Sequence, residues 1–156
     1  MNIFEKQSRL KPGAMATVAD RRFADAQALC DTKQNAHANG AAYLAGFVIE
    51  ILLKARLVKK YPIIARKQPH DISESERGIW TLIWRRHDLE EMLDCMPELE
   101  AALHKAFSRT GVNYLANLKK VCAAWTIHAR YSPRVIMMDE ASQFLERVRL
   151  LKEVLK

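Results

Sequence analysis

Apolar residues recur every three or four positions along most of the chain, which is the spacing of one face of an α-helix. This pattern predicts helices over residues 18–31, 41–58, 97–107, 114–122 and 139–155. No segment alternates apolar and polar residues as strands do, and no glycine-rich phosphate loop is present. The sequence therefore predicts an all-α fold and excludes the α/β folds that bind dinucleotides or nucleoside triphosphates.

The segment 41–58 is apolar around almost its full circumference, so we expect it to run through the middle of a helical bundle. Glu50 and Lys54 interrupt it four residues apart, with the glutamate first, which is the order that favours an ion pair within a helix. A helix of this kind has little solvated surface. We therefore expect further partners for this pair from elsewhere in the chain.

Two capping patterns mark further helices. Asp88, followed three residues later by Glu91, predicts a helix start. Ser73 and Glu76 have the same spacing ahead of the apolar run 79–84, which favours a helix there over the alternative of a short strand-like arm. Together these patterns predict an up-and-down bundle of about five to seven helices.

The length of 156 residues is that of one domain, which we expect over residues 17–156 after an extended lead-in at residues 1–16. The three cysteines are far apart and form no CxxC pair, as in a protein of the reducing cytoplasm. No two histidines lie one helical turn apart, so neither a metal nor a cofactor is expected. The longest apolar run is short for a membrane span and the N-terminal segment is charged, so we expect neither a membrane span nor an export signal.

The charge balance is basic, with 25 Lys and Arg against 18 Asp and Glu and a formal net charge of +7. This excess favours polyanionic partners such as RNA, DNA or an acidic protein, and a merely solvated basic surface is the alternative. The densest basic segment contains Lys54, Arg56, Lys59, Lys60, Arg66 and Lys67, and Arg85 with Arg86 forms a second cluster.

Three segments, taken in order, resemble the HEPN family. They are AAYLAGFVIEILLKARL at residues 41–57, HDL at residues 87–89, and the pair Arg130 and Tyr131 ahead of the closing helix. The resemblance extends over most of the chain and implies a compact helical bundle that is often a homodimer. It also implies a place in toxin–antitoxin or defence systems, or a partnership with a small nucleotidyltransferase. The apolar run 79–84 adds a further argument for a homodimer, because it exceeds what one small bundle needs.

Active HEPN ribonucleases carry an arginine followed, after four to six residues, by a histidine. The nearest such pair here is Arg66 and His70, with three intervening residues. RNA cleavage through the 2′-hydroxyl needs a base and positive charge on the phosphate. His128 and Arg130 are the candidate catalytic residues of a metal-independent endoribonuclease. The structural alternatives are a salt bridge from Arg130 to Glu50 or Asp88, and a partly buried His128 with a backbone partner.

The interpretation we favour is a HEPN-like homodimer that binds RNA or nucleotide phosphates. The residues expected to contact the ligand are Glu50, Lys54, Arg86, His87, Arg130 and Tyr131. Trp125 and Tyr131 are candidates for base stacking, with core packing as the alternative. Two other functions remain open, a metal-independent endoribonuclease and a non-catalytic helical partner of a separate nucleotidyltransferase.

Overall fold

The computed structural model describes residues 11–126 and 136–156, and within these ranges the chain is helical and contains no strand. Eight α-helices and two 3₁₀ turns make up the described chain. They are α1 (Pro12–Asp31), η1 (Asn35–His37), α2 (Ala38–Lys60), α3 (Pro62–Arg66), η2 (Pro69–Asp71), α4 (Glu74–Trp84), α5 (Leu89–Asp94), α6 (Pro97–Thr110), α7 (Tyr114–Ala124) and α8 (Met138–Leu155). The all-α prediction is confirmed.

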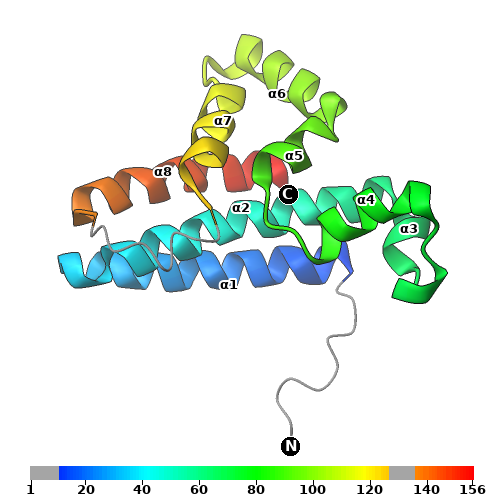
Figure 1. The fold of residues 1–156 in the computed structure, drawn as a ribbon. Helices are drawn as coiled ribbons and strands as arrows, with labels where there is room; N and C mark the ends of the chain where they lie inside the picture. The colour runs from blue at the N-terminus through cyan, green and yellow to red at the C-terminus, as the bar shows by residue number, and fades with distance from the viewer. Residues whose placement is uncertain (1–10, 127–135) are drawn as a thin grey trace, which may run out of the picture.

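The three longest helices, α1, α2 and α8, lie side by side along the molecule, with α2 in the middle (Figure 1). Most residues of α2 are buried, as its nearly continuous apolar circumference predicts. Helices α5, α6 and α7 project from the face of this layer where α2 and α8 lie. Helices α3 and α4 pack near the C-terminal end of α2. The central helix therefore packs against α1, α3, α4, α5 and α8, and its Lys60 side chain also reaches Glu98 of α6.

Helices α2 and α8 run in the same direction. At one end the Arg56 guanidinium donates hydrogen bonds to the carbonyl oxygens of Val154 and Leu155 at 3.0 and 2.9 Å. At the other end the Asn39 and Asn35 side chains accept hydrogen bonds from the backbone N–H groups that lead into α8. The last carbonyls of a helix have no intrahelical partner, so Arg56 supplies one and also places a positive charge at the negative end of the helix dipole.

Trp125, which directly follows α7, fits against Gly46 in the middle of α2. A Cβ atom added at Gly46 would lie 1.9 Å from Cδ1 of the Trp125 ring. The ring is buried, and its Nε1–H donates to the carbonyl oxygen of Tyr43 at 3.0 Å. The contact fixes where α7 meets α2 and assigns Trp125 to the core, which is the structural alternative considered for this residue.

Three expectations need correction. The first helix begins at Pro12 instead of residue 18, because proline is favourable at the first helical position. Pro62 likewise begins a short helix, α3, in addition to ending α2, which raises the number of described α-helices to eight. The direction alternates between α1 and α2 but not between α2 and α8, so the three long helices do not form a simple up-and-down arrangement.

The helix over residues 79–84 is confirmed, since α4 starts at Glu74 directly after Ser73. Its tryptophans pack toward α3: the indole N–H groups of Trp80 and Trp84 donate to the carbonyl oxygens of Lys67 and Ala65, both at 3.2 Å. This apolar run is accommodated within one chain. It therefore gives no support to the expected homodimer.

Candidate functional site

Glu50 is the centre of a buried polar cluster. Only 1% of its side chain is exposed. Its Oε1 accepts a hydrogen bond from Nζ of Lys54 at 2.7 Å and lies 2.8 Å from Nδ1 of His87, which donates to it when the carboxylate is ionised. Among the described residues its second oxygen, Oε2, has no hydrogen-bond partner. The prediction that this pair has a partner from elsewhere is confirmed, and the partner that the structure shows is His87.

Two parts of the fold bring this cluster together. Helix α2 supplies Glu50 and Lys54 one turn apart, and the connection between α4 and α5 supplies His87. The next residue, Asp88, is the N-cap of α5, and its carboxylate accepts from the backbone N–H of Glu91 at 2.9 Å. The cap that the sequence predicts is therefore confirmed. In this short connection His87 contacts α2, and the next residue, Asp88, caps α5.

The exposed side of the cluster is the His87 ring, of which 38% is accessible to solvent. Because Nδ1 is occupied by Glu50, the ring nitrogen left for a ligand or a proton is Nε2, which makes no hydrogen bond within the described ranges. A carboxylate that holds one nitrogen of an imidazole fixes the orientation and the tautomer of the ring. The arrangement is suited to donating or accepting a proton at Nε2.

Most cations of the basic segment 54–67 are used inside the molecule. Lys54 pairs with Glu50, and Arg56 binds the end of α8. Lys60 donates to Glu98 at 2.9 Å and Lys67 to Glu76 at 2.7 Å. Of the six basic residues in this segment, the described structure leaves Lys59 and Arg66 exposed and without such a partner.

The second basic cluster is also partly engaged. Nη1 of Arg86 donates to both carboxylate oxygens of Glu91, at 2.7 and 2.5 Å. The guanidinium of Arg85 lies over the ring of Trp80, 5.0 Å from its centroid. Both arginines remain on the surface beside His87. They can contact a phosphate, but Arg86 does so in competition with Glu91.

The candidate catalytic residues His128 and Arg130, and the candidate ligand contact Tyr131, lie outside the described residues. The alternative salt bridge from Arg130 to Glu50 or Asp88 likewise lies outside the described residues. Of the expected ligand contacts, Glu50, Lys54 and His87 come together, and Arg86 follows α4 immediately before His87.

A second feature, missed by inspection of basic clusters, is a stretch without acids. No Asp or Glu occurs between Glu100 and Asp139, and this stretch contains Lys105, Arg109, Lys119, Lys120, Arg130 and Arg134. Subtracting these six from the 25 basic residues leaves 19 against 18 acids in the rest of the chain. Nearly all of the net charge of +7 therefore belongs to one quarter of the sequence. The signal in the sequence was the absence of acids, not a local density of bases.

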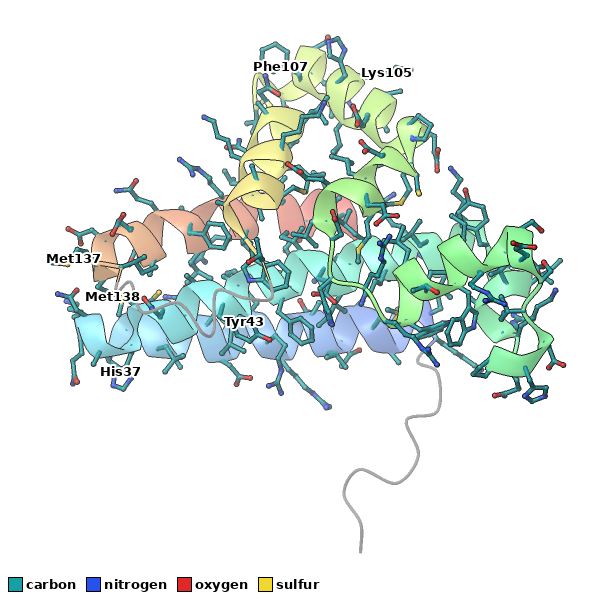
Figure 2. The ribbon with its side chains drawn as sticks, viewed as in Figure 1. His37, Tyr43, Lys105, Phe107, Met137 and Met138 are labelled. Atoms are coloured by element: carbon teal, nitrogen blue, oxygen red, sulfur yellow. The ribbon has the colours of Figure 1, made fainter. Side chains whose placement is uncertain are left out.

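Four of these cations lie on α6 and α7, which form an antiparallel pair that we call the hairpin (Pro97–Ala124). Lys105, Arg109 and Lys120 are exposed and have no ionic partner among the described residues. Lys119 pairs with Glu100 at 3.2 Å and is still more than half exposed. Figure 2 shows Lys105 and Phe107 at the outer edge of the hairpin, pointing away from the long helices. Other exposed cations without an ionic partner occur elsewhere among the described residues, so what distinguishes the hairpin is that three such cations share an element with no acid after Glu100.

The three cysteines are free thiols that are buried or partly buried. Burial raises the pKa of the Cys30, Cys95 and Cys122 thiols, and that of Cys122 reaches about 12. Because the thiolate is the reactive form, burial lowers the reactivity of these three thiols.

Within residues 11–126 and 136–156, no three His, Cys, Asp or Glu side chains gather in a way that could hold a metal ion. No helix in the same ranges is long and apolar enough to cross a membrane. Comparison of the chain with protein-family models, with curated proteins and with solved structures found no match.

Proposed function

We propose that this protein is a HEPN-like helical protein that binds RNA through its phosphates, with the hairpin as the principal contact surface. The observation that carries the proposal is the set of unpaired cations Lys105, Arg109 and Lys120 on an element that contains no acid after Glu100. A ligand phosphate at these positions meets no competing carboxylate from the same segment. The convergence of Glu50, Lys54 and His87, which carry much of the HEPN resemblance, supports the architectural part of the proposal.

The charge pattern also explains why the basic segment 54–67 is the weaker candidate. Cations that already pair with a carboxylate or a carbonyl must break that contact before they bind a phosphate. Unpaired cations instead exchange only water and loosely held counterions, and the release of those counterions drives phosphate binding. The hairpin therefore gains more from each phosphate contact than the segment 54–67 does.

The test measures how the affinity for a fluorescently labelled single-stranded RNA depends on salt. Wild-type binding is expected to weaken as salt rises. The double variant K105A/R109A should bind less tightly and have a log–log salt slope that is shallower by roughly 1.4, because each lost contact with a single strand removes about 0.7 from the slope. Absence of binding by the wild-type protein at low salt would reject the function itself.

The chain offers a matched control in K59A/R66A. This variant removes the same charge from two exposed cations that have no ionic partner among the described residues. We expect it to leave the affinity and the salt slope close to those of the wild-type protein. Equal losses in both double variants would mean that RNA responds to net charge alone and that the hairpin is not a defined surface.

A second function, metal-independent RNA cleavage, has one observation in its favour. Glu50 holds the imidazole of His87 by Nδ1, and the side chain is 38% exposed, so Nε2 is the nitrogen that can act as a general base. Incubation of RNA with the protein in chelator tests this function. Cleavage that is lost in His87→Ala supports a base at this position, whereas loss only in His128→Ala or Arg130→Ala assigns the chemistry to the segment 127–135. No cleavage by the wild-type protein removes the enzymatic alternative.

The homodimer that the HEPN resemblance implies is part of the proposal and has a separate test. Light scattering at micromolar concentration distinguishes a chain of 17.9 kDa from a particle of twice that mass. A monomer at all concentrations tested would remove the dimer without affecting the RNA-binding surface, since the cations that form it belong to one chain.

A further inference from the structure

We propose that a cavity between the end of α1 and the start of α8 binds a soft metal ion, Cu(I), through the sulfur atoms of Cys30, Met137 and Met138. The cavity has a volume of about 540 Å³, and all three sulfur-bearing residues line it. Cys30 comes from α1, and the two methionines lie at the start of α8. No residue of the hairpin lines the cavity, so the inference is independent of RNA binding.

The exposure of Met137 is the first observation that points to a ligand. Its side chain is 56% exposed, whereas Met138 beside it is 8% exposed and belongs to the core. The other described methionines, Met15, Met92 and Met96, are buried. An apolar side chain that stays in water forgoes the stabilisation that burial would provide. Core packing therefore explains the other described methionines but not Met137.

The fold holds the three sulfur-bearing residues at one end of the bundle. The backbone N–H of Met137 donates to the carboxylate of Glu140 at 2.8 Å, and that of Met138 donates to the side-chain oxygen of Asn35 at 2.8 Å. Cys30 lies in the last turn of α1, which packs against α8. Figure 2 shows both methionines where α8 begins. The cavity is therefore lined by donors whose backbone positions are set by the fold.

The donor types select the class of metal ion. Thiolate and thioether sulfurs are soft ligands that suit Cu(I), whereas Mg²⁺ and Ca²⁺ prefer oxygen. A zinc site needs several Cys, His or carboxylate ligands, and no three such side chains gather among the described residues. The histidine spacing that argued against a metal in the sequence does not test sulfur donors. On binding, the S–H bond of Cys30 breaks, a Cu–S bond forms and the proton leaves to solvent, with no change of oxidation state.

The charges around the cavity also favour a cation. Asp31 and Asp139 line it together with one basic residue, Lys33, so two carboxylates face one ammonium group. Asp31 accepts a hydrogen bond from the Gln27 amide at 2.8 Å, which leaves its negative charge in place. This local excess of acid contrasts with the formal net charge of +7 for the whole chain. A positive ion is attracted to such a position, and a phosphate is repelled.

The experiment is an anaerobic competition for Cu(I) between the reduced protein and the coloured chelator bicinchoninate. The wild-type protein should withdraw one Cu(I) per chain from the chelator. Cys30→Ser should abolish this withdrawal. Met137→Leu should weaken the affinity by at least about 10-fold, the smaller loss expected when a supporting group of a metal site is removed. Because Met137 is exposed, its replacement by leucine should leave the helical circular dichroism spectrum unchanged.

Cys95→Ser is the control. Cys95 is also a free thiol, directly precedes Met96, and does not line the cavity. This variant should bind one Cu(I) as the wild-type protein does. The inference is overturned if the wild-type protein withdraws no Cu(I), if Cys95→Ser loses as much as Cys30→Ser, or if Met137→Leu binds as tightly as the wild-type protein. Failure of the protein to bind RNA would leave all of these outcomes unchanged.

Discussion

Glu50 is an acid in the middle of an apolar helix. The side chains around it determine how far its burial lowers the stability of the fold. Moving a carboxylate out of water is unfavourable, and the attraction of Lys54 together with the hydrogen bond from His87 offsets this cost. A buried ion pair is not by itself a net source of stability. The contact with His87 has a structural role, because it fixes which residue of the α4–α5 connection faces α2.

Removing one member of the buried pair should cost far more than removing both. Glu50→Met leaves the Lys54 ammonium buried without its carboxylate, and we expect a loss of roughly 3–5 kcal/mol in the free energy of unfolding. The double variant Glu50→Met with Lys54→Met should recover most of that loss. Urea unfolding of the two single variants and the double variant measures the coupling. Losses that simply add would show that the two side chains do not depend on each other.

Gly46 is required by its contact with Trp125. A methyl group at this position would overlap the indole, so Gly46→Ala should lower the free energy of unfolding by about 1–3 kcal/mol despite the better helix propensity of alanine. Gly78 is the matched control, because a Cβ atom there meets nothing within 4 Å. Gly78→Ala should stabilise the protein by roughly 0.5–1 kcal/mol. Thermal unfolding measures both, and a stable Gly46→Ala protein would contradict the packing described for α2 and Trp125.

At the scale of elements, local patterns were sufficient where one helix face or one cap decides the outcome. The apolar spacing located the long helices, and Asp88 located the start of α5. The patterns failed for α3, because a proline that ends one helix can also begin the next. They also failed for the direction of α8. That direction depends on contacts such as Arg56 with the carbonyls of residues 154 and 155, which lie almost a hundred positions away in the sequence.

The start of α4 should depend on pH through Glu76. The Lys67 ammonium, and then the hydroxyl and backbone N–H of Ser73, lower the pKa of this carboxyl from 4.5 to about 2. A carboxyl whose folded pKa is depressed contributes stability above its unfolded pKa and loses it as pH falls through the folded value. The N-terminus of α4 should therefore stay intact at pH 4.5 and fray as the pH approaches 2. Carboxyl carbon chemical shifts in an NMR titration report the pKa directly.

Lys67→Ala separates the cause of this shift from the general acidity of the solution. It should move the pKa of Glu76 up toward its ordinary value, since Lys67 is the largest contribution. Lys59→Ala removes an equal charge that has no ionic partner among the described residues and should leave the pKa of Glu76 where it is. A pKa near 4.5 in the wild-type protein would mean that Lys67 and Glu76 are not paired in solution.

At the scale of the whole molecule, the net charge of the sequence favours a polyanionic partner but does not locate the contact surface that we propose. The net charge favoured a polyanion, and the segment 54–67 was the natural place to look because its basic residues are dense. Folding changes the answer, because four of those six cations acquire partners, and two of them, Arg56 and Lys60, acquire partners from the distant elements α8 and α6. The Glu50–Lys54 pair was readable from its spacing, whereas His87 as its partner required the fold to bring two elements together.

The difference in packing between the central helix α2 and the projecting helix α6 predicts how fast their backbone amides exchange with solvent. Helix α2 lies between α1 and α8 and should be opened only by global unfolding, whereas α6 packs mainly on α5 and α7 and should open locally at lower cost. Hydrogen exchange followed by mass spectrometry should therefore find the slowest amides in α2 and faster ones in α6. Adding single-stranded RNA should then slow exchange over residues 104–120 and leave residues 54–67 unchanged. Slowed exchange at residues 54–67 with no change in the hairpin would contradict this prediction. It would mean that RNA binds the segment that the sequence first suggested. It would also mean that the ion pairs of that segment open readily enough for a phosphate to replace the carboxylate.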